Sequence, residues 1–413
     1  MIGRNSRRWL FWTLLAVGFF FLSFYRVSSG VLVGELTQAF DATATELGLL
    51  HASFFYIYAA LQLPAGLLTD RYGPRAVAGT GVLVMSVAAA GFAFAGSLAA
   101  GFLARALVGL GGSVLYVAIL GFCANWFRAD EFATMNGVTI AVAALGGVAA
   151  TTPLALAVDV VGWRDAVLAT AGCSALGGVA ILAFVRDAPD GRDTGSAPDL
   201  RTVLSRSRTV VRRRDTWVLG GILFLVLGTN FTVLGLWGVP YIVHVYDASV
   251  ARASAYVLAG NVGLLLGSPF MGWLSDRTAS RTGIVVVSTA AFAAAYGLIA
   301  ALGKPPLLAV GAILFGSTFV QGGIVLVYTV GKERHPAEAG GTISGAINSM
   351  GYAGAAVVPA LMGGALDAFW TGAMVDGTRV YSLLGYRVAF GVAALAGGGA
   401  FALALFLHRR ATR

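Results

Sequence analysis

Apolar stretches long enough to cross a lipid bilayer recur along almost the whole chain, and they constrain its fold more than any other feature. A spanning helix needs about 20 predominantly apolar residues. Twelve stretches meet this length, near residues 9–36, 47–68, 77–95, 98–123, 134–158, 164–185, 217–243, 253–274, 284–302, 307–330, 340–366 and 386–407. Only 11% of the residues are charged, too few to coat the surface of a soluble domain. The sequence therefore predicts an all-α membrane protein with twelve transmembrane helices.

One long polar segment divides these stretches into two sets of six. Residues 186–215 are rich in Arg, Asp, Ser, Gly and Pro. We therefore expect an N-terminal six-helix bundle over residues 1–185, a cytoplasmic linker over 186–215 and a C-terminal six-helix bundle over 216–413.

The two sets also repeat each other. The pattern Gly, three residues, Asp-Arg, three residues, Arg follows the second stretch at residues 66–75 and the eighth stretch at residues 272–281. A Gly-aromatic-Arg triplet precedes the last stretch of each set, at residues 162–164 and 385–387. Two repeats at equivalent positions predict two pseudo-symmetric halves.

The basic residues predict the orientation of the chain in the membrane. If the N-terminus is cytoplasmic, both chain ends and the Arg-rich linker lie inside, and the outside receives only Arg164, Arg252, Lys304, Arg379 and Arg387. The net charge of +9 is then an orientation signal, and nucleic acid is not an expected partner. We expect a multi-pass protein of the cell's inner (plasma) membrane, with both termini cytoplasmic, that contacts lipid and a small-molecule substrate as a monomer.

The loops at residues 66–75 and 272–281 resemble the signature loop of the major facilitator superfamily. The run at residues 103–111, centred on Arg105, is similar to a second motif of that superfamily. The resemblance implies the superfamily fold and transport by alternating access around a central site. One departure lies in the fifth stretch, where residues 146–153 lack the pattern of the antiporter motif, which disfavours a drug/proton antiporter.

Each signature loop places an Asp beside two arginines at the cytoplasmic end of a helix. The Asp can cap or pair there while the Arg side chains bridge to neighbouring helices, and such contacts form in one state and part in the other. We therefore expect an inner gate, with simple cytoplasmic anchoring as the alternative. The gating candidates are Asp70, Arg71, Arg75, Asp276, Arg277 and Arg281.

No pattern of an enzyme is present. The sequence has no Gly-x-Ser-x-Gly, no His-Glu-x-x-His and no nucleotide-binding loop, and Cys123 and Cys173 lack metal-ligand spacing. We therefore expect neither an enzyme nor an ATP-driven pump, with no cofactor and no metal. The expected activity is secondary active or facilitative transport, as a symporter or uniporter.

Two arginines fall inside apolar stretches, whereas all 19 acidic residues fall at helix ends or in loops on these boundaries. A central Arg costs about 2.5–3.5 kcal/mol on insertion scales. Arg26 lies roughly 25 Å from the inner end of its helix and Arg105 roughly 28 Å from the inner end of its own, at 1.5 Å per residue. Superfamily branches that carry organic anions are similar around residues 24–28. We expect a small organic anion, or a zwitterion with a carboxylate, as the substrate.

Other interpretations of these arginines stay open. Arg105 could bond backbone carbonyls, Arg26 could extend towards the interface, and either could serve proton coupling. A drug/proton efflux transporter is the alternative function, although it would require a buried acid. A non-transporting receptor or scaffold on the same fold is a further alternative.

Several polar and aromatic residues could line the same site, although polar side chains also bond membrane helices together. The further substrate-binding candidates are Tyr25, Tyr56, Asn230, Trp237, Gln321 and Asn348. Glu35 and His51 are the candidates for proton coupling, with interfacial packing as the alternative for His51. The pair Asp376-Gly377, flanked by alternating apolar residues, predicts a β-hairpin between the last two helices.

Overall fold

The computed structural model describes residues 4–128, 131–189, 210, 212–278, 280–334, 340–375 and 378–411. The first part of the chain forms α1 (Arg4–Val27), η1 (Ser28–Gly30), α2 (Val33–Phe40), α3 (Ala44–Ala60), α4 (Gln62–Ala93), α5 (Leu98–Gly112), α6 (Leu115–Trp126), α7 (Phe132–Ala149), α8 (Thr152–Val161) and α9 (Trp163–Phe184). The second part forms α11 (Arg214–Thr232), η2 (Val233–Trp237), α12 (Gly238–Tyr246), α13 (Val250–Thr278), α14 (Arg281–Leu302), α15 (Leu307–Ile324), α16 (Val327–Glu333), α17 (Gly340–Asp367), β1 (Trp370–Val375), β2 (Thr378–Tyr381) and α18 (Leu383–Ala411).

Twelve crossings can be traced through these helices. Within the described residues, eleven helical spans of 22 to 33 residues are apolar enough to cross a membrane. The second crossing is built from α3, with 17 residues, and the beginning of α4. It ends at Gly73, whose φ of 81° and ψ of 153° interrupt α4 just before Pro74. A φ of this sign strongly favours glycine, so the signature loop turns the chain here into the third crossing.

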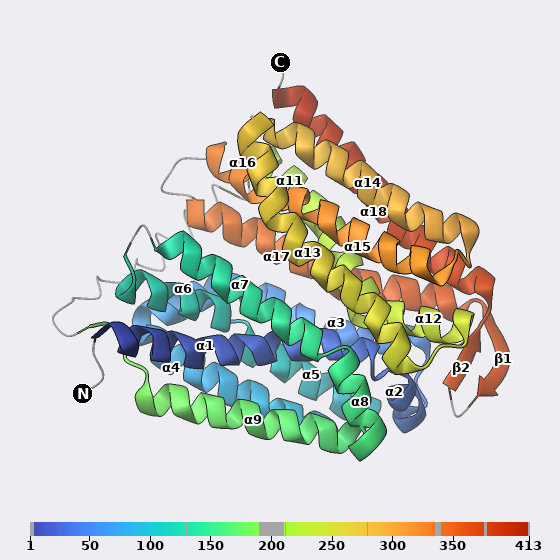
Figure 1. The fold of residues 1–413 in the computed structure, drawn as a ribbon, viewed down its shortest axis with the longest axis horizontal. Coiled ribbons are helices and arrows are strands. Elements are labelled where there is room, and N and C mark those ends of the chain that lie inside the picture. The colour runs from blue at the N-terminus through green and yellow to red at the C-terminus, as the bar shows by residue number, and fades with distance from the viewer. Residues whose placement is uncertain are drawn as a thin grey trace.

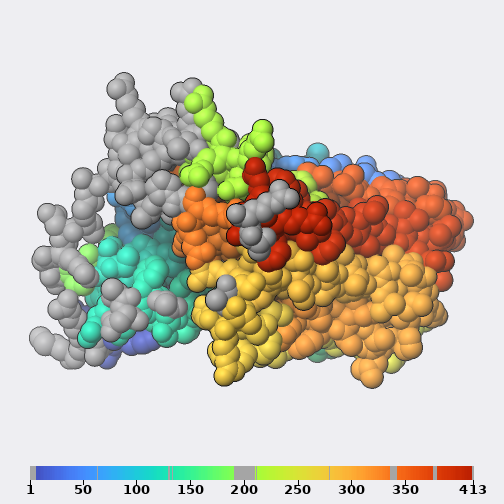
Figure 2. All heavy atoms as spheres, turned by 90° about the horizontal axis from the view of Figure 1, so that it is seen from above, coloured from blue at the N-terminus to red at the C-terminus, as the bar shows by residue number. Residues whose placement is uncertain are grey.

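The helices gather into two groups that lie one above the other in Figure 1, α1–α9 below and α11–α18 above. The groups meet where α3 packs along α17, where α8 and α7 pack against α13, and where η1 touches η2. Seen from above, helices of the second group cover most of the visible face (Figure 2). The linker predicted over 186–215 falls largely outside the described residues, at 190–209 and 211.

We use two names for the ends of the molecule. The hairpin end carries α2, α12 and the two strands (Figure 1), and the termini end is where α1 begins and α18 ends. At the hairpin end β1 pairs antiparallel with β2, with Trp370 opposite Tyr381 and Met374 opposite Arg379. The predicted β-hairpin is therefore confirmed, while its turn residues, Asp376 and Gly377, lie outside the described residues.

The Gly-aromatic-Arg repeat has the same structural role in both halves. The Nη2 of Arg164, at the start of α9, donates to the carbonyl of Ala95 after α4 (3.3 Å). Arg387, in the first turns of α18, donates from Nε to the carbonyl of Ala300 and from Nη2 to that of Ala301, both at 2.9 Å. The last carbonyls of a helix have no partner within it, so each arginine caps a neighbouring helix.

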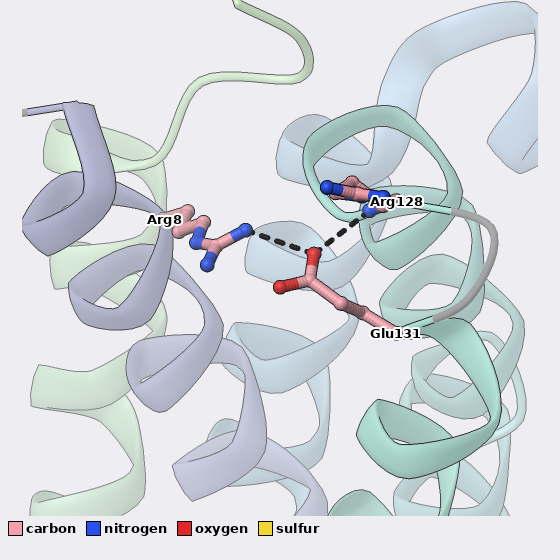
Figure 3. Close-up of polar contacts among 3 residues, drawn as sticks. All are labelled: Arg8, Arg128 and Glu131. Atoms are coloured by element: carbon pink, nitrogen blue, oxygen red, sulfur yellow. Dashed lines mark hydrogen bonds and ion pairs between the residues drawn. The ribbon is translucent and has the colours of Figure 1, made fainter.

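Ion pairs at the termini end join the first helix of each half to its fourth-to-fifth connection. The Nη1 of Arg8 in α1 donates to Oε2 of Glu131 (2.9 Å), which also accepts from the backbone N–H of Arg128 (2.9 Å; Figure 3). In the second half, Asp215 pairs with Arg334 at 3.5 Å and with Arg410 at 3.8 Å. In the first half the first helix contributes the arginine of this ion pair, and in the second half the first helix contributes the carboxylate.

Candidate functional site

Arg26 lies in the last turn of α1, and its side chain is surrounded by aromatic rings. Only 8% of it is exposed. Nη1 donates to the Tyr352 hydroxyl at 3.3 Å, and Nη2 donates to the Tyr58 hydroxyl at 3.4 Å. The guanidinium carbon is 5.1 Å from the ring centre of Tyr58, 5.4 Å from those of Phe231 and Tyr352, and 5.9 Å from that of Phe54. We call these five residues the Arg26 cage.

The Arg26 cage combines residues from both halves. Phe54 and Tyr58 are four positions apart on α3, so they lie on one face of that helix. Phe231 comes from α11 and Tyr352 from α17, in the second half. The rings of Tyr58 and Tyr352 meet edge to face, with centres 4.5 Å apart. A molecule bound beside Arg26 would therefore touch both halves.

The charge of Arg26 has no carboxylate partner among the described residues. Its two hydrogen bonds go to phenol oxygens at distances beyond the usual range of 2.7–3.2 Å, and its Nε has no partner. Aromatic faces offset part of the cost of burying a cation. The planar guanidinium keeps the geometry to bind a carboxylate or a similar anion through two parallel hydrogen bonds.

Two Tyr–Asn pairs flank the cage at pseudo-symmetric positions. Tyr116 donates to Oδ1 of Asn136, and Tyr328 donates to Oδ1 of Asn348, both at 2.8 Å and both across 20 positions of sequence. Nδ2 of Asn348 also donates to Oε1 of Gln62 in the other half, at 3.0 Å. Nε2 of Gln62 in turn donates to the backbone carbonyl of Tyr58 at 3.3 Å, so this pair is connected to the Arg26 cage.

Arg105 lies elsewhere, on α5, and is 5% exposed. Its guanidinium carbon is 5.8 Å from the ring centre of Phe92, and its Nε and Nη2 have no partner. The imidazole of His51 is fully buried and lies close enough to Arg105 for the two groups to interact electrostatically. Different residues therefore surround the two guanidinium groups.

The separation of the two arginines follows from helix direction. Side chains in a helix point towards its N-terminus. Because α1 runs towards the hairpin end and α5 runs away from it, the side chains of Arg26 and Arg105 lean in opposite directions along the helix axes. The sequence positions of Arg26 and Arg105 predict similar depths in the membrane, but they do not show in which direction each side chain points.

Three of the other substrate-binding candidates make contacts apart from the Arg26 cage. The hydroxyl of Tyr25 lies 3.1 Å from Oγ of Ser174 inside the first half. Tyr56 is 48% exposed. Nε1 of Trp237 donates to the carbonyl of Pro359 at 3.3 Å, within the second half.

The remaining candidates are polar residues of the second half. Asn348 belongs to the Tyr–Asn pair described above. The side-chain oxygens of Asn230 in α11 and Gln321 in α15 are buried without a hydrogen-bond partner. Such orphan polar groups are costly in a protein interior, and a bound ligand or water would satisfy them.

The gating candidates of the first signature loop lie at the termini end. Arg75 donates from Nε to the carbonyl of Leu182 at 2.8 Å, and its backbone N–H donates to Oδ1 of Asp187 at 2.6 Å. Asp70 and Arg71 are exposed, and the guanidinium of Arg71 lies over the ring of Tyr72, 5.3 Å from its centre.

The second signature loop borders a cavity of about 610 Å³ at the same end, which includes Asp276 and Arg281 in its lining. Arg281 forms an ion pair with Glu333 of α16. Arg277 lies over the ring of Trp273, 5.1 Å from its centre. The contacts of Arg75, Arg71, Arg277 and Arg281 described here all join residues of the same half.

Glu35 lies in the first turn of α2 at the hairpin end, outside the membrane-spanning helices. Burial raises the pKa of its carboxyl group above the usual value, and the carboxylate of Asp159 adds to the rise. The structure places this carboxyl group on a different element from every member of the Arg26 cage.

Sequence reasoning missed most of the cage. Tyr58, Tyr352 and Phe231 were not among the candidates, and neither was the Tyr116–Asn136 pair. Two signals were present in the sequence: the aromatic residues of α3 recur with helical spacing, and a Tyr precedes an Asn by 20 positions in each half.

Comparisons with known proteins agree with this architecture. The family model of the Major Facilitator Superfamily matches residues 14–359. The chain is 28% identical to a probable sulfoacetate transporter of Cupriavidus necator, over 68% of this chain and 67% of the relative. It is also 28% identical to a probable nitrate/nitrite transporter of Mycobacterium tuberculosis, over 81% and 85%.

The fold is shared with a solved structure of a bacterial homologue of the human lysosomal transporter Spinster. The TM-score is 0.79 at 17% sequence identity, and 98% of each chain is covered. The match of the family model over most of the chain, with the two helical groups and their repeated motifs, shows that this protein belongs to the Major Facilitator Superfamily and is a multi-pass membrane transporter.

Proposed function

We propose that this transporter moves a small organic anion, or a zwitterion that bears a carboxylate, by alternating access. The observation that carries the proposal is the buried guanidinium of Arg26, which has only two long hydrogen bonds to phenol oxygens. A buried cation without a counter-ion is costly, and an anionic substrate would supply the missing charge.

In this proposal the substrate displaces the two phenol oxygens as acceptor for Nη1 and Nη2 of Arg26. The hydroxyl groups of Tyr58 and Tyr352 can then donate to the anion. Hydrogen bonds in which the donor or the acceptor is ionised are shorter and roughly twice as strong as neutral ones. Because Tyr352 comes from the second half, the bound anion would link the two halves and lower the cost of bringing them together.

The relatives support an anionic substrate. The names of the two curated relatives described above refer to sulfoacetate and to nitrate or nitrite, which are all anions. The drug/proton alternative draws no support from the Arg26 cage, whose polar contacts in the described residues are hydroxyl groups rather than carboxylates. Proton coupling through Glu35 or His51 stays a prediction.

The proposal includes the expected topology. The termini end would face the cytoplasm, with bundles over residues 1–185 and 216–413 and the signature loops acting as an inner gate. The hairpin end, where α3 and α17 touch, would be the closed side in this conformation. The protein would work as a monomer in the inner membrane.

The test begins with the purified protein and a thermal-shift screen of carboxylates, sulfonates, nitrate, sugar acids, amino acids, dipeptides and cationic drugs. A ligand that binds the native state raises its melting temperature by mass action. Anions should raise it and cationic drugs should not. The best anion then serves as the probe for uptake into liposomes.

Substitutions at Arg26 give the sharpest result. Arg26→Ala should abolish uptake while the protein remains abundant in the membrane. Arg26→Lys keeps the charge but loses the two-pronged geometry, so binding of the anion should weaken roughly tenfold or more, equivalent to about 1.5–3 kcal/mol for one charge-assisted hydrogen bond. If Arg26→Ala binds and transports the anion as the parent does, the proposed site is wrong.

A further inference from the structure

A carboxylate of the second half binds the first turn of a helix in the first half. Asp367 is the last residue of α17, at the hairpin end. Its Oδ1 accepts from the backbone N–H of Ala44 at 2.9 Å, and its Oδ2 accepts from the backbone N–H of Thr45 at 2.7 Å. The hydroxyl of Thr45 also donates to Oδ2, at 2.5 Å.

Asp367 accepts hydrogen bonds from N–H groups at the N-terminus of α3 that the capping box of the helix does not use. The first N–H groups of a helix have no partner within it. In α3 a capping box pairs the N–H of Glu46 with Oγ1 of Thr43, and the N–H of Thr43 with Oε2 of Glu46. The N–H groups of Ala44 and Thr45 bind Asp367 instead. The helix dipole also favours a negative charge at this position.

The backbones on either side of this contact are packed without space for side chains. A Cβ atom added to Gly363 would overlap the carbonyl oxygen of Ala44. A Cβ atom added to Gly48, one turn further along α3, would overlap the carbonyl oxygen of Pro359. Glycine at both positions therefore allows α3 and α17 to close against each other.

The hairpin lies over the same contact. Tyr381 of β2 is buried, and burial raises the pKa of its phenol, with a further contribution from the nearby carboxylate of Asp367. The contact is only partly buried, so water can reach it when the halves part. It is thus placed to form and break during a transport cycle.

We propose that Asp367 is the latch that holds the hairpin end of this transporter closed. When the halves part at this end, the carboxylate and two backbone N–H groups must be hydrated, and closure restores their contacts. A latch of this kind biases the equilibrium between the two open forms without touching the substrate. This role is separate from that of Arg26 and does not depend on the identity of the substrate.

Spin labels can measure the population of each form in the full-length protein. Gln38 in α2 and Arg252 in α13 are exposed and belong to opposite halves near the hairpin end, so a label pair at these positions reports its opening. Cys123 and Cys173 would first be replaced. The distance distribution is then read by double electron–electron resonance in liposomes.

Asp367→Asn keeps the volume of the side chain but turns an amide N–H₂ towards a helix N–H. The ratio of closed to open forms should fall about tenfold, which corresponds to about 1.4 kcal/mol. Glu46→Gln is the matched control, because it makes the same chemical change in the same helix turn while its partner lies in its own half. This control should leave the distances unchanged.

Two further variants keep the test decisive. Gly363→Ala should favour the open form by steric overlap with Ala44, which shows that the labels detect opening. Thr45→Val removes only the hydroxyl donor, so it should shift the ratio of closed to open forms in the same direction as Asp367→Asn but by a smaller factor. If Asp367→Asn does not fold, Thr45→Val takes its place in the test. If Gly363→Ala lengthens the distances while Asp367→Asn and Thr45→Val leave them as in the parent, Asp367 is not the latch.

Discussion

The Arg26 guanidinium keeps a charge in surroundings that are mostly aromatic. Moving an Arg to the centre of a membrane costs about 2.5–3.5 kcal/mol on insertion scales. A cation–π contact contributes about 0.5–1 kcal/mol at an exposed site and about 2 kcal/mol when desolvated, so the four rings of the cage offset much of this cost. The rings do not satisfy the hydrogen-bond donors of Arg26, and an anion would accept from these donors.

We predict that the hydroxyl of Tyr58 contributes to binding of the anion. Tyr58→Phe keeps the ring over Arg26 and removes the oxygen that now lies 3.4 Å from Nη2. Because a bound anion would lose one hydrogen-bond donor, worth about 1 kcal/mol, its dissociation constant should rise roughly fivefold. Isothermal titration with the best anion of the screen measures this change.

Tyr56→Phe is the matched control for this experiment, because Tyr56 is on the same helix and 48% exposed. It should bind the anion as the parent does. Equal affinities for the parent and Tyr58→Phe would show that the Tyr58 hydroxyl does not contact the substrate.

At the scale of the elements, the two capping arginines explain why a Gly-aromatic-Arg triplet recurs. Helix α14 ends at Leu302, followed by Gly303 with a φ of 72°, and Arg387 donates to two carbonyls of its last turn. The equivalent cap by Arg164 holds the end of α4. The repeated Gly-aromatic-Arg triplet therefore corresponds to a contact between the third and sixth crossings of each half.

The cap at α14 can be tested by stability. Arg387→Ala leaves the carbonyls of Ala300 and Ala301 without these donors and should destabilise the protein by about 1 kcal/mol, the usual net contribution of a hydrogen bond. Thermal denaturation in detergent should show a lower melting temperature than that of the parent. Arg379→Ala, at a partly exposed hairpin arginine that lies over Trp370, is the comparison and should change it less. The same melting temperature for both variants would contradict the capping role.

At the scale of the whole molecule, the two ends differ in how the halves meet. At the hairpin end α3 and α17 are in backbone contact and Asp367 bridges them. At the termini end the described ion pairs join elements of the same half, as Arg8 does with Glu131 (Figure 3). In Figure 1, α14 and α18 of the second group also diverge from α1 and α9 of the first group towards this end.

The expected orientation of these ends predicts the result of reporter fusions. A reporter at the C-terminus should be active as a cytoplasmic fusion, because the basic residues gather at the termini end. A reporter inserted at Gly377, between β1 and β2, should be active only as a periplasmic fusion. A periplasmic signal from the C-terminus would overturn the predicted orientation.

The sequence by itself determined the twelve crossings, the family, the two repeated halves and the hairpin. Each of these depends on features that are local in the chain: the length of an apolar stretch, the spacing within a loop, or an Asp-Gly pair between strands. Lipid requires every backbone polar group in a span to be bonded internally, so a long apolar stretch has few alternatives to a helix.

Only the tertiary structure decided which side chains meet. Arg26 and Tyr352 are 326 positions apart, and Asp367 and Ala44 are 323 positions apart. Whether such residues touch depends on how the two halves pack and on the direction of each helix, which sends Arg26 and Arg105 to different neighbours. Periodicity within one helix shows which residues share a face, but it does not show which helix that face will contact, and the cage and the latch both arise from that choice.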